Sequence, residues 1–392
     1  MDNRHIRSAH SIRAAVLIAG GTLIGPKGDA GPGWLSVDDG KITGIGSGNP
    51  PRQPEHDFRP YTITPGFIDI HLHGGGGRSF EEKNLDAAQA VLAAHRAHGT
   101  TTAVASLISA PLDELVAAMH TYRPLVESGL LAGIHLEGPF LSAEYRGAHP
   151  ARHLRAPDPT TLARLLEAGR GILAVITLAP ELDGAIPAIQ TIRAAGVQAA
   201  VGHTAATYEQ TVAAIQAGAT IATHLCNAMQ PPHHRTPGPV TALLENPRIA
   251  VELIADGIHL HPAVLALLAR TAGPDRTVMI SDAIAAAASA DGTYTLAGQP
   301  VHAKDGRALI AGTDILAGST LTLDAALRHA VASGIPLPAA ITSLTTNPAR
   351  LLGLKDRGQL TTGQRADLVI LNEHLHVHAI ITNGQLQVQQ QQ

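Results

Sequence analysis

The fold is decided by Thr64-Pro65-Gly66-Phe67-Ile68-Asp69-Ile70-His71-Leu72-His73-Gly74, in a chain of 392 residues. The run Phe67–Leu72 is mostly apolar and lies between two glycines, which is typical of a parallel strand that is covered on both faces. Side chains two positions apart on a strand point to the same face, so the imidazoles of His71 and His73 lie on the same face of this strand. The stretch therefore predicts a buried strand that ends in two histidines.

Seven further runs of the same character follow, and most are separated by segments with helical periodicity. Eight strand–helix units in series predict a closed (β/α)₈ barrel. A doubly wound open sheet is the alternative, but it usually has fewer strands and a glycine-rich turn after the first. The further strands are expected at Thr101–Leu107, Leu131–Glu137, Gly171–Leu178, Val197–His203, Thr220–His224, Ile249–Asp256 and Val278–Asp282. The helices are expected at Leu85–His98, Leu112–Val126, Thr161–Ala168, Ile186–Ala195, Tyr208–Ala217, Ala263–Ala272, Leu321–Ala332 and Leu337–Leu352.

Both ends of the chain have short alternating runs and turn signals instead of this pattern. The predicted class is α/β. Residues 63–354 are expected to form a catalytic, metal-binding barrel, and the flanking residues 1–62 and 355–392 are expected to form together a small β-sandwich domain. Ala283–Ala290 is expected to be a flexible loop or a helix start, and the terminal glutamines a frayed tail. The end strands are expected at Ala14–Ala19, Trp34–Val37, Lys41–Ile45, Ala366–Leu371, Val377–Thr382 and Gln385–Val388, the last two joined by a hairpin turn.

The composition excludes several classes of partner. The net charge is -4, only 15% of residues are charged, and no basic block occurs, so neither nucleic acid nor a membrane surface is an expected partner. The first apolar run is too short for a signal peptide or a membrane span. The single cysteine, Cys226, excludes an intrachain disulfide framework and favours a reducing, cytoplasmic location.

Polar side chains that can bind metal end five of the predicted barrel strands. Active sites of such barrels form where the carboxyl ends of the strands converge. Imidazole and carboxylate groups suit Zn²⁺, Fe²⁺ or Mn²⁺, and this number of groups allows one ion or two. With 22 histidines, one H-x-H pair is expected by chance, but not this arrangement on five strands. The residues are His71, His73, Glu137, His203, His224 and Asp282.

Several longer motifs resemble the N-acetylglucosamine-6-phosphate deacetylases of the amidohydrolase superfamily. The opening strand resembles that of the superfamily as a whole, and the remaining motifs follow the order of the deacetylase family from about residue 14 to the C-terminus. They are His135-Leu136-Glu137-Gly138-Pro139-Phe140, Gly147-Ala148-His149-Pro150, Gly202-His203-Thr204, Thr223-His224-Leu225-Cys226-Asn227-Ala228-Met229, Asp256-Gly257-Ile258-His259, Ser281-Asp282-Ala283 and Leu316-Ala317-Gly318-Ser319.

The resemblance implies a role for each matched position. Glu137, His203 and His224 match the ligands of a required metal. Zinc is the expected ion, and iron, manganese and cobalt are the alternatives. His71 and His73 match a second, more variable metal position. Asp282 matches the catalytic carboxylate. Arg235 matches a phosphate-binding arginine that reaches across the interface of a homodimer. The positions that match substrate contacts are Ala148, His149, Asn227, Ala228, Asp256, His259, Leu316, Ala317 and Gly318.

The expected activity is hydrolysis of the N-acetyl group of N-acetylglucosamine 6-phosphate. A divalent ion lowers the pKa of a bound water towards ~7. Asp282 can take a proton from that water and deliver it to the sugar nitrogen. The alternatives are a related amidohydrolase acting on N-acetylgalactosamine 6-phosphate or an N-acyl amino acid, and a non-catalytic barrel that serves as a scaffold.

Overall fold

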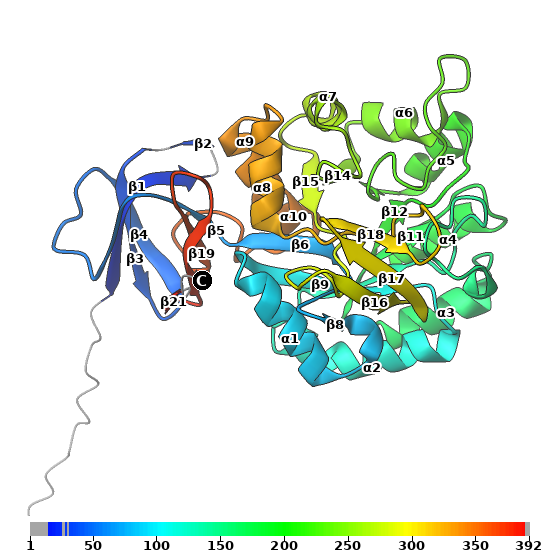
Figure 1. Ribbon diagram of the computed structural model, residues 1–392, viewed down its shortest axis with the longest axis horizontal. Helices are drawn as coiled ribbons and strands as arrows, with labels where there is room; N and C mark the ends of the chain where they lie inside the picture. Colours follow the sequence, from blue (N-terminus) through cyan, green and yellow to red (C-terminus); the bar gives the residue numbers. More distant parts are fainter. Residues whose placement is uncertain (1–14, 26–27, 30, 389–392) are drawn as a thin grey trace, which may run out of the picture.

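The computed structural model describes residues 15–25, 28–29 and 31–388, so the predicted glutamine tail and the first fourteen residues lie outside the described part. A small sheet domain stands beside a larger barrel, and the first and last strands both belong to the sheet domain (Figure 1). Among the described residues, none of the helices combines the length and apolar character that a membrane span needs.

The barrel sheet has eight parallel strands, and the prediction of a (β/α)₈ barrel is confirmed. The strand order follows the chain, and the segment after the last strand returns to the first, where the amide of Asp282 donates to the carbonyl of His71 at 3.0 Å. The sheet is therefore nearly closed. Its strands are β6 (Phe67–Leu72), β9 (Thr100–Ile108), β10 (Gly133–Glu137), β11 (Leu173–Leu178), β12 (Gln198–Val201), β13 (Ile221–Ala222), β14 (Ala250–Ile254) and β15 (Thr277–Ile280).

Helices surround these strands and bury their apolar faces against them (Figure 1). The sequence did not predict α6, and the expected helix Leu337–Leu352 is two helices that meet at Thr345, where the backbone leaves the helical region (φ -134°). The helices are α1 (Leu85–Arg96), α2 (Leu112–Glu127), α3 (Pro159–Ala168), α4 (Ala185–Ala194), α5 (Tyr208–Ala217), α6 (Gly238–Glu245), α7 (Pro262–Ala272), α8 (Leu323–Ala332), α9 (Leu337–Leu344) and α10 (Thr346–Leu351), with single 3₁₀ turns η1 (Phe80–Glu82) and η2 (Ala151–His153).

An antiparallel sheet that the sequence did not predict follows the eighth barrel strand. It consists of β16 (Gly292–Leu296), β17 (Gln299–Lys304) and β18 (Arg307–Ile310), and its apolar side chains pack over Ala148 and Ile284. The segment Ala283–Ala290, expected to be a flexible loop or a helix start, is an irregular loop with turns and does not begin a helix. Residues 283–287 are buried, and Ala283 accepts hydrogen bonds from the amides of residues 73 and 74, next to the short strands β7 (Gly74–Gly75) and β8 (Arg78–Ser79).

Strands from both chain ends assemble in one small β domain, as the sequence predicts, and they are hydrogen-bonded into one mixed sheet. β5, which the sequence did not predict, pairs with β1 in parallel and with β19 antiparallel, and so joins the two ends. A Cβ at Gly66 would lie 2.1 Å from Oγ1 of Thr101, so the passage from β5 into β6 requires glycine. The boundaries at 62/63 and 354/355 stay a prediction. The strands are β1 (Val16–Gly25), β2 (Gly28–Asp29), β3 (Gly33–Asp38), β4 (Lys41–Ser47), β5 (His56–Pro65), β19 (Leu368–Leu371), β20 (Val377–Thr382) and β21 (Gln385–Val388).

Candidate active site

The carboxyl ends of the barrel strands bring the predicted metal-binding side chains together. Glu137 is the last residue of β10, whereas His203, His224 and Asp282 each lie two residues beyond the end of a strand. These three have positive φ angles of 48°, 27° and 50°. Non-glycine residues rarely adopt this backbone conformation, and such strain clusters at functional sites because the surrounding structure has to enforce it.

The four imidazoles lie in two pairs. Nε2 of His203 is 3.1 Å from Nε2 of His224, and Nε2 of His71 is 3.3 Å from Nε2 of His73. Two nitrogens bound to one tetrahedral ion through bonds of ~2.0 Å would lie roughly 3.3 Å apart. Each pair therefore has the spacing of two ligands on a single metal ion.

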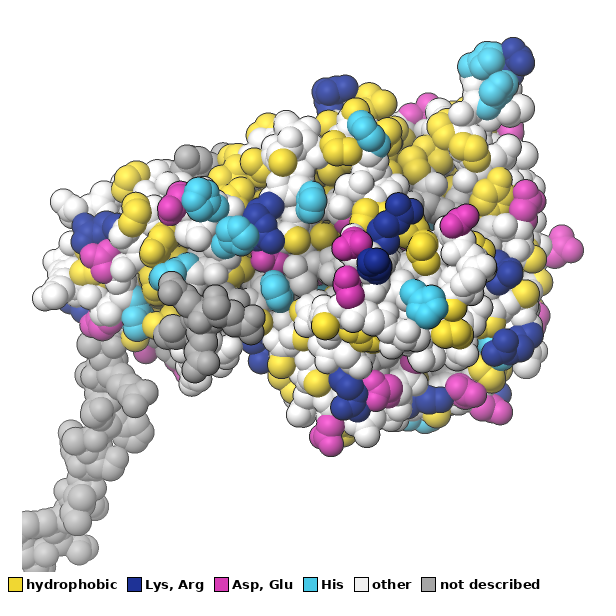
Figure 2. All heavy atoms as spheres, viewed as in Figure 1, with side chains coloured by type: hydrophobic (Ala, Val, Ile, Leu, Met, Phe, Trp, Pro, Cys, Tyr) yellow, Lys and Arg dark blue, Asp and Glu magenta, His cyan; other side chains and the backbone are white. Residues whose placement is uncertain are grey.

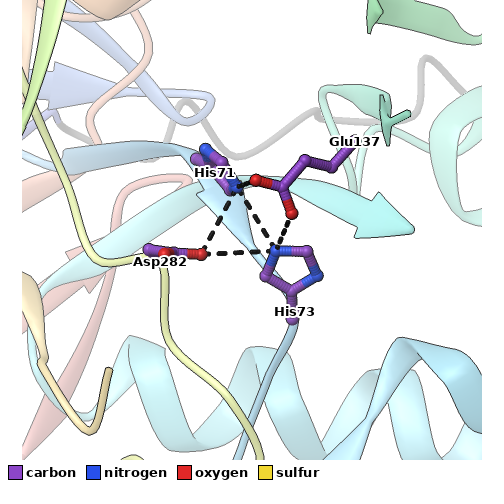
Figure 3. A group of neighbouring side chains, drawn as sticks. All are labelled: His71, His73, Glu137 and Asp282. Atoms are coloured by element: carbon purple, nitrogen blue, oxygen red, sulfur yellow. Dashed lines mark hydrogen bonds and ion pairs between the residues drawn. The ribbon is translucent and has the colours of Figure 1, made fainter. Parts of the chain in front are cut away.

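The carboxylate of Glu137 lies between the two pairs. Its Oε1 is 3.0 Å from Nε2 of both His203 and His224, and its Oε2 is 3.2 Å from Nε2 of His73. Asp282 completes the second group, with Oδ1 3.3 Å from Nε2 of His73 and 3.4 Å from Nε2 of His71 (Figure 3). Glu137 is thus placed to bridge two ions.

Hydrogen bonds on the far side of two imidazoles show which nitrogen is free to bind metal. Nδ1 of His203 lies 2.9 Å from the carbonyl oxygen of Tyr145 and Nδ1 of His71 lies 3.3 Å from the carboxylate of Glu252. Carbonyl and carboxylate oxygens only accept, so each Nδ1 carries the hydrogen and each Nε2 of a neutral ring is bare. A bare nitrogen facing the carboxylate of Glu137 is repelled unless a proton or a metal cation lies between them. Burial lowers the pKa of His71, but the carboxylates of Glu137 and Asp282 outweigh it and raise that pKa well above its ordinary value. The donor set therefore fits one or two divalent ions.

The charges of the cluster keep the carboxylates of Asp282 and Glu137 ionised. Burial raises the pKa of Asp282, but the neighbouring His71 and His73 side chains outweigh it and lower that pKa to about 2. Burial likewise raises the pKa of Glu137, but the surrounding imidazoles outweigh this effect and hold that pKa well below its ordinary value. At neutral pH both groups are available as metal ligands or as proton acceptors.

His149 faces the same carboxylate as a hydrogen-bond donor. The amide of Ser109 donates to Nδ1 of His149 at 3.3 Å, and Oγ of Ser109 lies 2.9 Å from the same nitrogen. Nδ1 is therefore the acceptor, and Nε2, 3.3 Å from Oε2 of Glu137, carries the hydrogen. Burial lowers the pKa of His149 to about 4, so the ring is neutral at pH 7.

A cavity of about 470 Å³ opens above the cluster. This is a usual size for a small-molecule site. The wall also includes residues 144–146 and 314–315 and the apolar side chains of Ile108, Ile284 and Leu296, which the sequence did not single out as site residues. The predicted residues on its wall are His73, Glu137, Ala148, His149, His203, His224, Asn227, Ala228, His259, Asp282, Leu316 and Gly318.

Four predicted residues are not on this wall. His71 lies beneath it against Glu137, and Ala317 is fully buried. Asp256 lies behind His259 and accepts a 2.6 Å hydrogen bond from its Nδ1. Arg235 is exposed in a loop before α6 that projects from the barrel (Figure 1), where His and Arg side chains gather at the tip (Figure 2). Within one chain, Arg235 is not part of the cavity.

Sequence reasoning missed Glu252, which lies on β14 inside the barrel. Its side chain is buried, and Oε2 accepts from the amide of His224 at 3.2 Å as well as from Nδ1 of His71. A signal was present, since a carboxylate inside the apolar run of β14 has to find partners when it is buried. The partners themselves come from β6 and from the segment after β13, so the sequence did not identify them.

Comparisons with known proteins identify the family to which the chain belongs. A model of the amidohydrolase family matches residues 62–388. The N-acetylglucosamine-6-phosphate deacetylase of Bos taurus is 37% identical over 345 residues, which are 83% of each chain. The N-acetylgalactosamine-6-phosphate deacetylase of Escherichia coli O157:H7 is 38% identical over 366 residues, 90% of this chain and 96% of that one.

Solved structures show the same fold over nearly the whole chain. An N-acetyl-D-glucosamine-6-phosphate deacetylase of Mycobacterium smegmatis is 44% identical with a TM-score of 0.93, and the match covers 95% of this chain and 99% of that one. That protein is a variant with one aspartate replaced by alanine, in complex with N-acetyl-D-glucosamine-6-phosphate. The chain therefore belongs to the amidohydrolase family, in the branch of the N-acetylglucosamine-6-phosphate deacetylases.

Proposed function

We propose that this chain hydrolyses the N-acetyl group of N-acetylglucosamine 6-phosphate and releases acetate and glucosamine 6-phosphate. The proposal rests on one observation above the others. Glu137 lies between two imidazole pairs at single-ion spacing, with ionised Asp282 on the wall of the cavity above them. The relatives that share most of this chain are named for the same reaction class.

Glu137, His203 and His224 would hold the required divalent ion, and His71 and His73 a second one. An ion bound there supplies a water of lowered pKa and polarises the acetyl oxygen. The donor set is compatible with zinc, iron, manganese or cobalt, and we propose zinc because nitrogen donors predominate over oxygen donors.

The protein's own side chains then handle the protons. Asp282 accepts a proton from the attacking water at its carboxylate and transfers it to the sugar nitrogen as the C–N bond breaks. The Nε2–H of His149 donates to the acetyl oxygen, on which negative charge develops. Both groups lie on the wall of the same cavity, next to Glu137.

The sugar phosphate would bind in the remaining part of the cavity. Asn227, Ala228 and His259 line it, and Asp256 orients His259 through the Nδ1 hydrogen bond. The exposed position of Arg235 supports a homodimer in which this arginine reaches the phosphate in the other subunit. A guanidinium matches the geometry of a phosphate dianion. With a single cysteine, the chain suits a reducing cytoplasm.

N-acetylgalactosamine 6-phosphate is the second candidate substrate, because a relative named for it matches over 90% of this chain. Initial rates of acetate release distinguish the candidates. We expect the highest kcat/KM for N-acetylglucosamine 6-phosphate, lower values for the galactose isomer, and little turnover of free N-acetylglucosamine or an N-acetyl amino acid. Preference for another substrate would refute the assignment, and no acetate release from any of them would favour the scaffold.

A further inference from the structure

The barrel interior contains a buried carboxylate, Glu252, that contacts the ring of His71 in one imidazole pair and the backbone of His224 in the other. One oxygen, Oε2, lies 3.3 Å from Nδ1 of His71 and accepts from the amide of His224 at 3.2 Å. Its side chain is 2% exposed. Unlike His149, which is equally buried, Glu252 does not line the cavity, so it lies behind the cluster rather than within reach of a substrate.

The contact with Glu252 determines how His71 is presented to its neighbours. An amide N–H can only donate, so Oε2 is already acting as an acceptor towards the His224 backbone. The same oxygen keeps the hydrogen of His71 on Nδ1, which leaves Nε2 directed at Glu137 and Asp282, 3.4 Å from each. Partners of this kind orient a ligating imidazole and make it a stronger ligand.

Other contacts fix the backbone of His71, and the ring of His135 packs against its ring at a centroid distance of 4.6 Å without contacting Nδ1 through a hydrogen bond. Its amide donates to Asp69 at 3.2 Å and its carbonyl accepts from the amide of Asp282 at 3.0 Å. The ring nitrogens contact Glu252 on one side and the metal-site groups on the other. Among the residues that the structure describes, Glu252 is the group that contacts Nδ1 of His71.

We propose that Glu252 is a positioning residue that keeps Nε2 of His71 free and thereby controls binding of the second divalent ion. This inference rests on the metal centre of the proposed function. Glu252 does not touch the substrate, and its contact with the first pair is to the backbone of His224 only. The second position should therefore depend on Glu252 far more than the first.

Zinc binding to the full chain tests the proposal. Metal is removed, the chain is titrated with Zn²⁺, and bound zinc is measured by mass spectrometry. The wild type is expected to bind two equivalents. Glu252→Met, which removes the acceptor at similar length, should weaken the second binding step about 10–100-fold and leave the first. Glu252→Gln, whose amide oxygen can accept at the same place, should restore most of the second step.

A double-mutant cycle separates positioning from general damage to the fold. His71→Gln removes the ligand itself, so Glu252→Met should weaken zinc binding no further in a His71→Gln background. Asp324→Asn, which alters a buried carboxylate on α8 outside the barrel, is the matched control and should still bind two equivalents.

Three outcomes would overturn the inference. They are an unchanged second step in Glu252→Met, equal weakening of both steps, and a wild type that binds only one equivalent. A wild type that binds no divalent ion would instead refute the proposed function itself.

Discussion

At the scale of single residues, Asp282 is held ionised and in contact with the second imidazole pair, where it can act as proton acceptor and then donor. Replacing it by asparagine keeps the shape but removes the proton transfer. We expect Asp282→Asn to lower kcat for acetate release by about 10²–10⁴-fold. Bound zinc at the first position, measured alongside, should stay the same, and a fall in kcat of less than tenfold would exclude this role.

His149 has a different role, because its Nε2 carries the hydrogen. His149→Ala should lower kcat by about 10²–10³-fold through loss of the donor to the acetyl oxygen. Steady-state kinetics and metal analysis of the same preparation check this. If the variant loses metal instead, His149 is a ligand, and our assignment of its tautomer is wrong.

The sequence predicted most of the residues that surround the cavity but not the contacts among them. Period-two alternation and strand ends were enough to bring His71, His73 and Glu137 together. The pairing of His203 with His224 could not be predicted, because its spacing depends on the positive φ angles of these two residues just after their strands. The partners of the buried carboxylate on β14 depend on tertiary packing in the same way.

At the scale of elements, all eight barrel strands could be predicted, since each is a short buried run with clear ends. Their lengths could not: β13 has only Ile221–Ala222, because the chain turns at once to present His224. The β16–β18 sheet could not be predicted because it is an insertion in the barrel pattern, and its alternating residues directly follow the alanine-rich loop 283–290.

Asp324 joins α8 to the end of α1 and gives a pH dependence of stability. Burial raises its pKa, but His98 at 3.1 Å, Thr322 and Arg328 hold that pKa well below its ordinary value. A lowered pKa stabilises the fold above the unfolded value of about 3.9, and this contribution is lost as the pH falls towards the folded value. Asp324→Asn should therefore reduce the free energy of unfolding by about 1.5–3 kcal/mol at pH 7.

Urea unfolding at several pH values measures this effect. The difference between Asp324→Asn and the wild type should shrink below about pH 4, where the unfolded carboxyl is protonated. A difference that does not depend on pH would show that the charge of Asp324 is not the cause.

At the scale of the whole molecule, one chain forms the metal site and the cavity but leaves Arg235 exposed on a projecting loop. We expect Arg235→Ala to lower the preference for phosphorylated over unphosphorylated substrate about 10–100-fold, as loss of hydrogen bonds to a charged group predicts. The ratio of kcat/KM values measures this, and sedimentation reports the oligomeric state. An unchanged ratio would remove Arg235 from the site, and a monomeric active wild type would exclude a contribution across subunits.

The central claim is that the cluster around Glu137 is a divalent-metal centre that removes an acetyl group from an amino sugar phosphate. Acetate release from N-acetylglucosamine 6-phosphate by the purified chain, before and after treatment with a chelator and after Zn²⁺ is added back, tests it most directly. We predict turnover that is lost with the metal and restored with it. No acetate release from the metal-loaded chain, or turnover that survives complete removal of the metal, would contradict the account.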